Sequence, residues 1–214
     1  MGGNAVVDSK NKRINSESFL VRITLGTLNF SKERTLGRLV EKKWPDSWFA
    51  IECYVLTWFA AATFLYPMVH ISNIGGIFYF WLVIVVLGGY RLYEIISFHA
   101  FELIKPDNHN IHSAQRSFIL AAINYAEIVL WFGIFYSIMN IQGLIEAKNP
   151  ASIAILHESI VFMLCDSGRG IVLRENYWSW LVVTIQSVIG LFMTLVVITR
   201  FVSLLPASTS QDSS

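Results

Sequence analysis

Four long runs of apolar residues occupy most of the chain after position 47. A helix needs about 20 mostly apolar residues to cross the hydrocarbon core of a bilayer, and each run reaches or approaches that length. Gly, Pro, Asp and Asn residues, which commonly end helices, stand at their borders. The pattern therefore predicts four membrane-spanning helices, over residues 48–69, 76–98 (with apolar residues continuing to 103), 118–139 and 180–205.

A shorter apolar run lies in the long connection between spans three and four, residues 140–179. It follows Pro150 and extends over about 14 residues, a length typical of a re-entrant segment and too short to span a membrane. A polar loop, Cys-Asp-Ser-Gly-Arg-Gly at 165–170, comes next. We predict an all-α membrane protein with four transmembrane helices and a re-entrant helix and loop between spans three and four. The alternative to a functional role for the 165–170 loop is a re-entrant or surface loop whose glycines only permit a turn.

The composition agrees with a membrane protein. Hydrophobic residues make up 54% of the chain and charged residues 14%, whereas soluble domains carry roughly 25% charged residues. These values exclude a soluble enzyme domain, a nucleic-acid binder and a disordered protein. The two cysteines, Cys53 and Cys165, are isolated and form neither a disulfide framework nor a zinc motif. We therefore expect no metal and no cofactor.

Basic residues are concentrated near the N-terminus, where residues 1–47 hold nine of the sixteen Lys and Arg. Because the flanks of the spans on that side are also the more basic ones, the positive-inside rule places both termini in the cytoplasm. We predict a multi-pass protein of the plasma membrane. Basic and apolar residues are interleaved in the N-terminal arm, which indicates either a segment resting on anionic lipid or a leader that only sets topology.

The order of elements from span three onward, with a Gly-x-Gly loop at Gly168 and Gly170 and a further glycine at Gly190, carries a family resemblance. Over residues 116–206, about half of the chain, it resembles the pore domain of tetrameric potassium channels. That family has a spanning helix, a half-length pore helix, a filter reading Thr-Val-Gly-Tyr-Gly and a second spanning helix. Residues 167–170 align with the last four filter positions, and Gly190 stands where the inner helix of the family has its hinge glycine.

The resemblance implies a homotetramer that conducts ions passively around spans three and four. Residues 151–165 would form the pore helix, and Gly190 the hinge of the gate. A potassium filter works by replacing the hydration shell of the ion with backbone carbonyls. The corresponding filter here is Asp166, Ser167, Gly168, Arg169 and Gly170.

Two departures from the family filter change the expected selectivity. Asp166 replaces threonine, and four such carboxylates in a ring favour cations. Arg169 replaces tyrosine and either hydrogen-bonds behind the filter or faces the lumen, where its charge repels cations. We expect monovalent cations to pass, and these two departures put potassium selectivity in doubt. The other expected partners are membrane lipids, and no nucleic acid.

Ionisable residues also lie inside the predicted spans. Arg91 and Glu94 are in span two, and Glu127 is in span three with Asn124. Such a residue costs about 2.5–3.5 kcal/mol on insertion scales, so it usually faces the bundle and has a partner. Because Arg91 and Glu127 have similar predicted depths, we expect an intramembrane charge network. It either couples the first two spans to the pore or simply holds the bundle together.

The predicted organisation has four parts: a cytoplasmic basic arm (1–47), a two-helix membrane hairpin (48–104), a pore-like domain (116–206) and a cytoplasmic tail (207–214). Two alternatives to an ion channel remain. One is a channel-like protein that no longer conducts and acts in membrane assembly or regulation. The other is a small membrane enzyme using His157, Glu158 and Asp166, although the chain lacks the Gly-x-Ser-x-Gly and His-Glu-x-x-His motifs. We expect no enzymatic activity.

Overall fold

The computed structural model describes residues 48–71, 78–104, 114–149, 151–166, 170–173 and 177–203. The predicted arm, 1–47, and tail, 207–214, lie outside these residues. The described residues form, in chain order, α4 (Trp48–Ile71), α5 (Phe78–Ile104), α6 (Ala114–Ile141), β1 (Ile145–Ala147), α7 (Ser152–Met163), β2 (Ile171–Leu173) and α8 (Tyr177–Val202).

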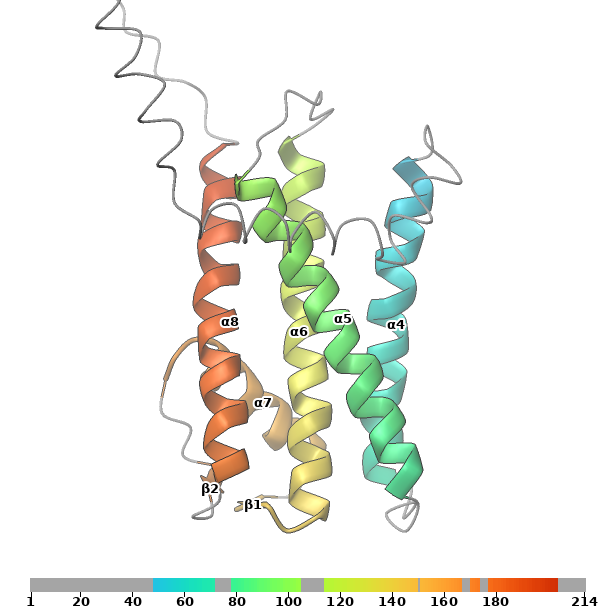
Figure 1. The fold of residues 1–214 in the computed structure, drawn as a ribbon, viewed down its shortest axis with the longest axis vertical. Coiled ribbons are helices and arrows are strands. Elements are labelled where there is room, and N and C mark those ends of the chain that lie inside the picture. Colours follow the sequence, from blue (N-terminus) through green and yellow to red (C-terminus); the bar gives the residue numbers. More distant parts are fainter. Residues whose placement is uncertain are drawn as a thin grey trace, which may run out of the picture.

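Four of these helices, α4, α5, α6 and α8, are long and apolar enough to cross a membrane. They run alternately in opposite directions, so the start of α4 and the end of α8 lie at the same end of the bundle (Figure 1). The prediction of a mostly helical, multi-pass membrane protein is confirmed. The structure begins α6 at Ala114 and α8 at Tyr177, earlier than the apolar pattern indicated. Polar and amphipathic residues in these first turns are compatible with a helix that starts at headgroup level.

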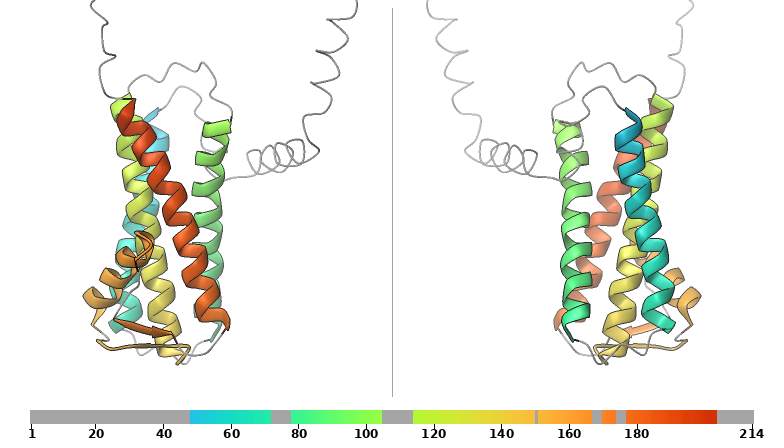
Figure 2. Two further views of the ribbon diagram at one scale, coloured as in Figure 1. Left: turned by 90° about the vertical axis from the view of Figure 1, so that its left-hand side faces the viewer. Right: turned by 90° about the vertical axis from the view of Figure 1, so that its right-hand side faces the viewer.

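α6 is the central helix, because it contacts α4, α5, α7 and α8. Half of its apolar window, 50%, is buried inside the protein, against 17% for α4. α4 packs along α6 rather than along α5, so the two helices of the predicted hairpin are not each other's main neighbours. α5 and α7 lie on opposite sides of α6 (Figure 2).

The chain between α6 and α8 forms an insert that starts and finishes at the same end of the bundle (Figure 1). β1 and β2 pair antiparallel with Glu146 opposite Val172, and the Lys148 N–H donates to the Gly170 carbonyl at 2.8 Å. Between these strands, α7 rises beside α6. The Tyr66 hydroxyl of α4 donates to the carbonyl of Ser152 at the start of α7. Both ends of the insert are thus attached to one end of the bundle.

Candidate functional site

The end of α7 packs against the middle of α8. A Cβ atom at Gly190 would collide with the backbone carbonyl of Met163, so glycine allows the two helices to touch through their backbones. The Cys165 thiol lies 3.4 Å from the Ser187 carbonyl, in hydrogen-bonding range. At a rise of about 1.5 Å per residue, Ser187 and Gly190 lie about 15 and 20 Å along α8 from Tyr177. The tip of α7 therefore lies beside the middle of α8.

The chain reverses at this tip through a C-terminal cap. The Cys165 N–H donates to the Phe162 carbonyl and the Asp166 N–H to the Val161 carbonyl, both at 3.1 Å. These two bonds have the spacing of a Schellman motif. Cys165 occupies its left-handed position with a φ of 58°, where glycine is usual and another residue costs about 1–2 kcal/mol. The cap leaves Asp166 exposed on the surface of the chain.

A neutral hydrogen-bond network joins α7 to both neighbouring spans. The Tyr136 hydroxyl of α6 donates to Gln186 Oε1 of α8. Gln186 Nε2 donates to the carbonyl of Ser159 in α7 at 2.8 Å. The Ser159 hydroxyl in turn donates to the Val129 carbonyl of α6 at 2.8 Å. All three side chains are buried, so this network fixes the position of α7 at mid-span.

Glu158 lies directly behind the end of the predicted filter. Its side chain is 10% exposed, and a Cβ at Gly170 would collide with its Oε1. Among the described residues, no hydrogen-bond partner is found for the buried Oε2. Gly170 does not have a left-handed φ. The absence of a side chain at Gly170 therefore allows the close approach of this carboxylate.

The predicted filter is described at its two ends only. Asp166 caps α7 and Gly170 precedes β2, whereas Ser167, Gly168 and Arg169 lie outside the described residues. The three residues of the enzyme alternative are not brought together. His157 Nδ1 lies 3.6 Å from Glu158 Oε1, but the His157 side chain is 70% exposed. Asp166 lies beyond the C-terminal end of α7, whereas His157 and Glu158 are in the middle of that helix.

A second buried polar site lies on the other side of α6 and contains the predicted charge network. The Arg91 guanidinium of α5 binds both carboxylate oxygens of Glu127 in α6, with Nε–Oε1 and Nη2–Oε2 distances of 2.7 and 2.9 Å. Its Nη1 lies 2.8 Å from Glu94 Oε2 one turn further along α5. The exposed fractions are 3% for Arg91, 5% for Glu94 and 0% for Glu127. We call these three residues the charge cluster.

Aromatic residues of α4 and α6 complete the surroundings of the charge cluster. The Tyr54 hydroxyl donates to Glu94 Oε2 at 2.7 Å. The Arg91 guanidinium lies 5.2 Å from the Tyr54 ring centroid and 5.6 Å from that of Trp58, distances at which cation–π attraction operates. Trp131 Nε1 donates to Glu127 Oε1 at 3.3 Å. The cluster thus joins α4, α5 and α6.

Sequence reasoning missed the residues that support these sites. Gln186 is a polar residue within an apolar span, and that was the available signal for the neutral network. Tyr54 and Trp58 carried no such signal, because aromatic residues are common in spans. Sequence reasoning also did not indicate the ion pair between Glu52 and Arg116, in which Nε and Oε1 are 2.6 Å apart.

Within the described part of the chain, no three His, Cys, Asp or Glu side chains come together in a way that could hold a metal ion. No protein-family model matches the chain, and neither a curated protein nor a solved structure matches it. Function must therefore be argued from the geometry of the insert and of the charge cluster.

Proposed function

We propose that the protein is a subunit of a tetrameric ion channel that conducts monovalent cations passively. The single observation that carries this proposal is the position of Asp166. Its exposed carboxylate follows the tip of α7, beside the middle of α8. Ionisable side chains within membrane spans commonly face a water-filled cavity and mark the path of an ion. A lumen shared by several subunits would supply such a cavity.

The course of the insert supports the same proposal. It begins and ends at one end of the bundle, and its tip lies at mid-span, as expected of a re-entrant pore helix and filter. The carboxyl end of α7 carries the negative end of the helix dipole. Four such ends, with four Asp166 carboxylates, would favour cations at the centre of the membrane.

Exposed apolar side chains on α8 and at the tip of α7 supply contacts for a tetramer. α8 presents a row of exposed apolar side chains along its length, at Leu181, Ile185, Val188, Leu191, Leu195 and Ile198. Leu164 is exposed beside Asp166. In the proposed assembly these residues line or surround the lumen, and Gly190 is the hinge of the gate. With both termini in the cytoplasm of a plasma-membrane protein, the insert lies on the outer side.

The proposal is tested first by assembly and then by flux. The purified chain should have four times the subunit mass of 24.3 kDa. In vesicles it should conduct cations in preference to anions. Asp166→Asn should reduce that preference, whereas Asp166→Glu should keep it. Glu146→Gln is the matched control, because it removes an exposed carboxylate on β1, outside the four spans.

Three results would overturn the channel proposal. One is a stable monomer, since a single chain has no central lumen. The second is the absence of ion flux in vesicles that contain correctly folded protein. The third is an unchanged cation preference in Asp166→Asn, which would remove the carboxylate from the conduction path.

A further inference from the structure

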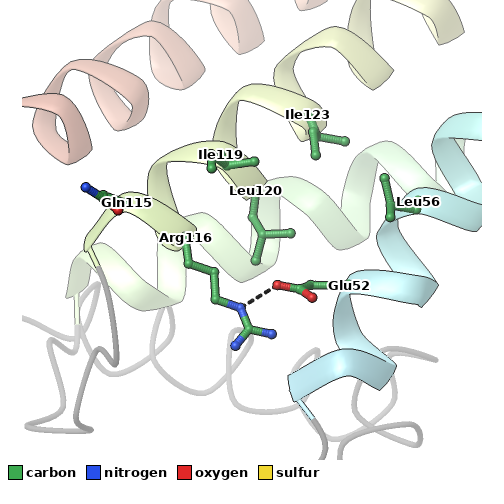
Figure 3. A pocket seen from close by; sticks show the side chains of 7 residues that line it. All are labelled: Glu52, Leu56, Gln115, Arg116, Ile119, Leu120 and Ile123. Atoms are coloured by element: carbon green, nitrogen blue, oxygen red, sulfur yellow. Dashed lines mark ion pairs between the residues drawn. The ribbon is translucent and has the colours of Figure 1, made fainter.

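A groove opens between α4 and α6, at the end of the bundle opposite the insert (Figures 1 and 3). Its volume is about 430 Å³. The side chains that line it are Glu52 and Leu56 of α4 with Gln115, Arg116, Ile119, Leu120 and Ile123 of α6. The groove therefore has apolar walls and two charged groups of opposite sign.

The charged groups stand at one end of the groove and the apolar groups continue from them toward the middle of the bundle. Arg116, Ile119, Leu120 and Ile123 are spaced as residues of one helical face, and Figure 3 shows them directed toward the space beside α4. From Arg116 to Ile123 this face extends about 10 Å along α6. Such a surface matches a molecule with a polar head and an apolar tail.

The charged end of the groove lies at the level of the membrane boundary. The apolar windows of α4 and α6 begin at Phe49 and Gln115, so Glu52 and Arg116 belong to the first turns of their spans. Arg116 Nε lies 2.6 Å from Glu52 Oε1, and the two side chains are 28% and 36% exposed. Both charges are therefore accessible to a ligand from the surrounding bilayer.

We propose that this groove binds a membrane phospholipid with an ethanolamine headgroup. The lipid phosphate would accept hydrogen bonds from Arg116, whose guanidinium has five donors and can serve a carboxylate and a phosphate together. The primary ammonium would donate to Glu52, and an acyl chain would lie against Leu56, Ile119 and Ile123. This site concerns a different part of the molecule from the insert and does not depend on ion conduction.

The two opposite charges select this headgroup among phospholipids. A choline headgroup has the same net charge, but its quaternary ammonium has no N–H to donate to Glu52. A glycerol headgroup offers Arg116 a phosphate and brings no cation to Glu52. We therefore expect ethanolamine lipid to bind more tightly than either, by about tenfold or more, as expected for one additional hydrogen bond to a charged group.

Native mass spectrometry of the full chain, with added phosphatidylethanolamine, phosphatidylcholine or phosphatidylglycerol, tests this proposal. The wild-type chain should retain the ethanolamine lipid about ten times more strongly than the choline lipid, or more. Glu52→Gln should abolish that preference, and Arg116→Gln should weaken the retention of all three lipids. If Arg116→Gln does not fold, Arg116→Lys should bind with intermediate strength, because lysine keeps the charge and loses the planar fork.

The matched controls are Glu146→Gln and Lys148→Gln, which remove one charge of each sign from exposed residues at the other end of the bundle. Both should retain lipids as the wild-type chain does. Equal retention of ethanolamine and choline lipids by the wild-type chain would overturn the proposal. An unchanged preference in Glu52→Gln would do the same, as would occupation of the groove by another segment of the chain.

Discussion

α5 and α7 attach to opposite sides of α6 through different kinds of polar contact (Figure 2). The contact of α5 is charged, with Arg91 bound to Glu127 at 2.7 Å. The contact of α7 is neutral and joins Tyr136, Gln186 and Ser159 by hydrogen bonds. Both contacts are buried. The charged contact lies near the middle of α5 and α6, whereas Tyr136 and Gln186 lie closer to the end of the bundle that carries the insert.

The apolar packing around these contacts differs as well. α7 is short, yet it packs against α6 more extensively than the longer α5 does, and it buries Ile155, Phe162 and Met163 in the core. Within lipid there is no hydrophobic force between helices, and packing and polar contacts hold them together. We infer that α5 depends on a few charges, whereas α7 depends on many small contributions.

The largest expected effect is that of Glu127→Gln. It replaces the carboxylate that binds two guanidinium nitrogens of Arg91, and breaking a buried ion pair costs about 3 kcal/mol or more. Glu94→Gln is the matched control, because its amide oxygen still accepts from Tyr54 and Arg91, and it should cost about 1 kcal/mol or less. Unfolding of the purified variants in mixed micelles, followed by tryptophan fluorescence, measures both. Equal losses in the two variants would contradict the assignment of Glu127 as the main partner of Arg91.

An intermediate effect is expected at the tip of α7. Gly190→Ala places a methyl group against the Met163 carbonyl, and overpacking of this kind costs about 1–3 kcal/mol. Gly89→Ala is the matched control, since nothing lies within 4 Å of a Cβ there and alanine favours a helix over glycine by about 1 kcal/mol. In the same micelle assay the first variant should be less stable than the wild-type chain and the second at least as stable. If the two alanine variants are equally stable, contact between the backbones of α7 and α8 does not hold these helices together.

The smallest effect is expected in the neutral network. Tyr136→Phe removes the hydroxyl that donates to Gln186, and the loss of one such bond in a membrane protein averages about 0.6 kcal/mol, with a maximum of about 1.7 kcal/mol. Thr184→Val is the control, because that hydroxyl is exposed and bonds to the Trp180 carbonyl of its own helix. A loss for Tyr136→Phe as large as that for Glu127→Gln would remove the distinction between the attachments of α5 and α7.

Part of this architecture was predictable from local pattern. The lengths of the apolar runs indicated four spans, because a bilayer sets the length of the helices that cross it. The positions of Arg91 in span two and Glu127 in span three indicated that the two residues lie at similar depths in the membrane. The cost of an unpaired charge in lipid explains why they meet. A 12-residue helix after Pro150 also agrees with the short apolar run between spans three and four.

Other features involve residues that are distant in sequence, and no local pattern indicated them. α4 lies along α6 rather than α5, which depends on how side chains of α4 and α6 fit together. Gly170 makes room for Glu158, and Gly190 makes room for Met163; the sequence indicated neither of these two close approaches. The sequence did not predict the chain reversal at Cys165 either, because a non-glycine residue rarely adopts a left-handed φ.

The sequence by itself determined that this chain belongs in a membrane, how many of its helices are long and apolar enough to cross one, and which charges need partners. These properties follow from solvation, since each apolar run and each ionisable residue has its own transfer free energy between water and lipid. Only the tertiary structure decided which helix is central, where the tip of α7 lies, and that Glu52 and Arg116 share a groove. These depend on close packing between segments, where the position of one backbone carbonyl or one carboxylate decides what fits beside it.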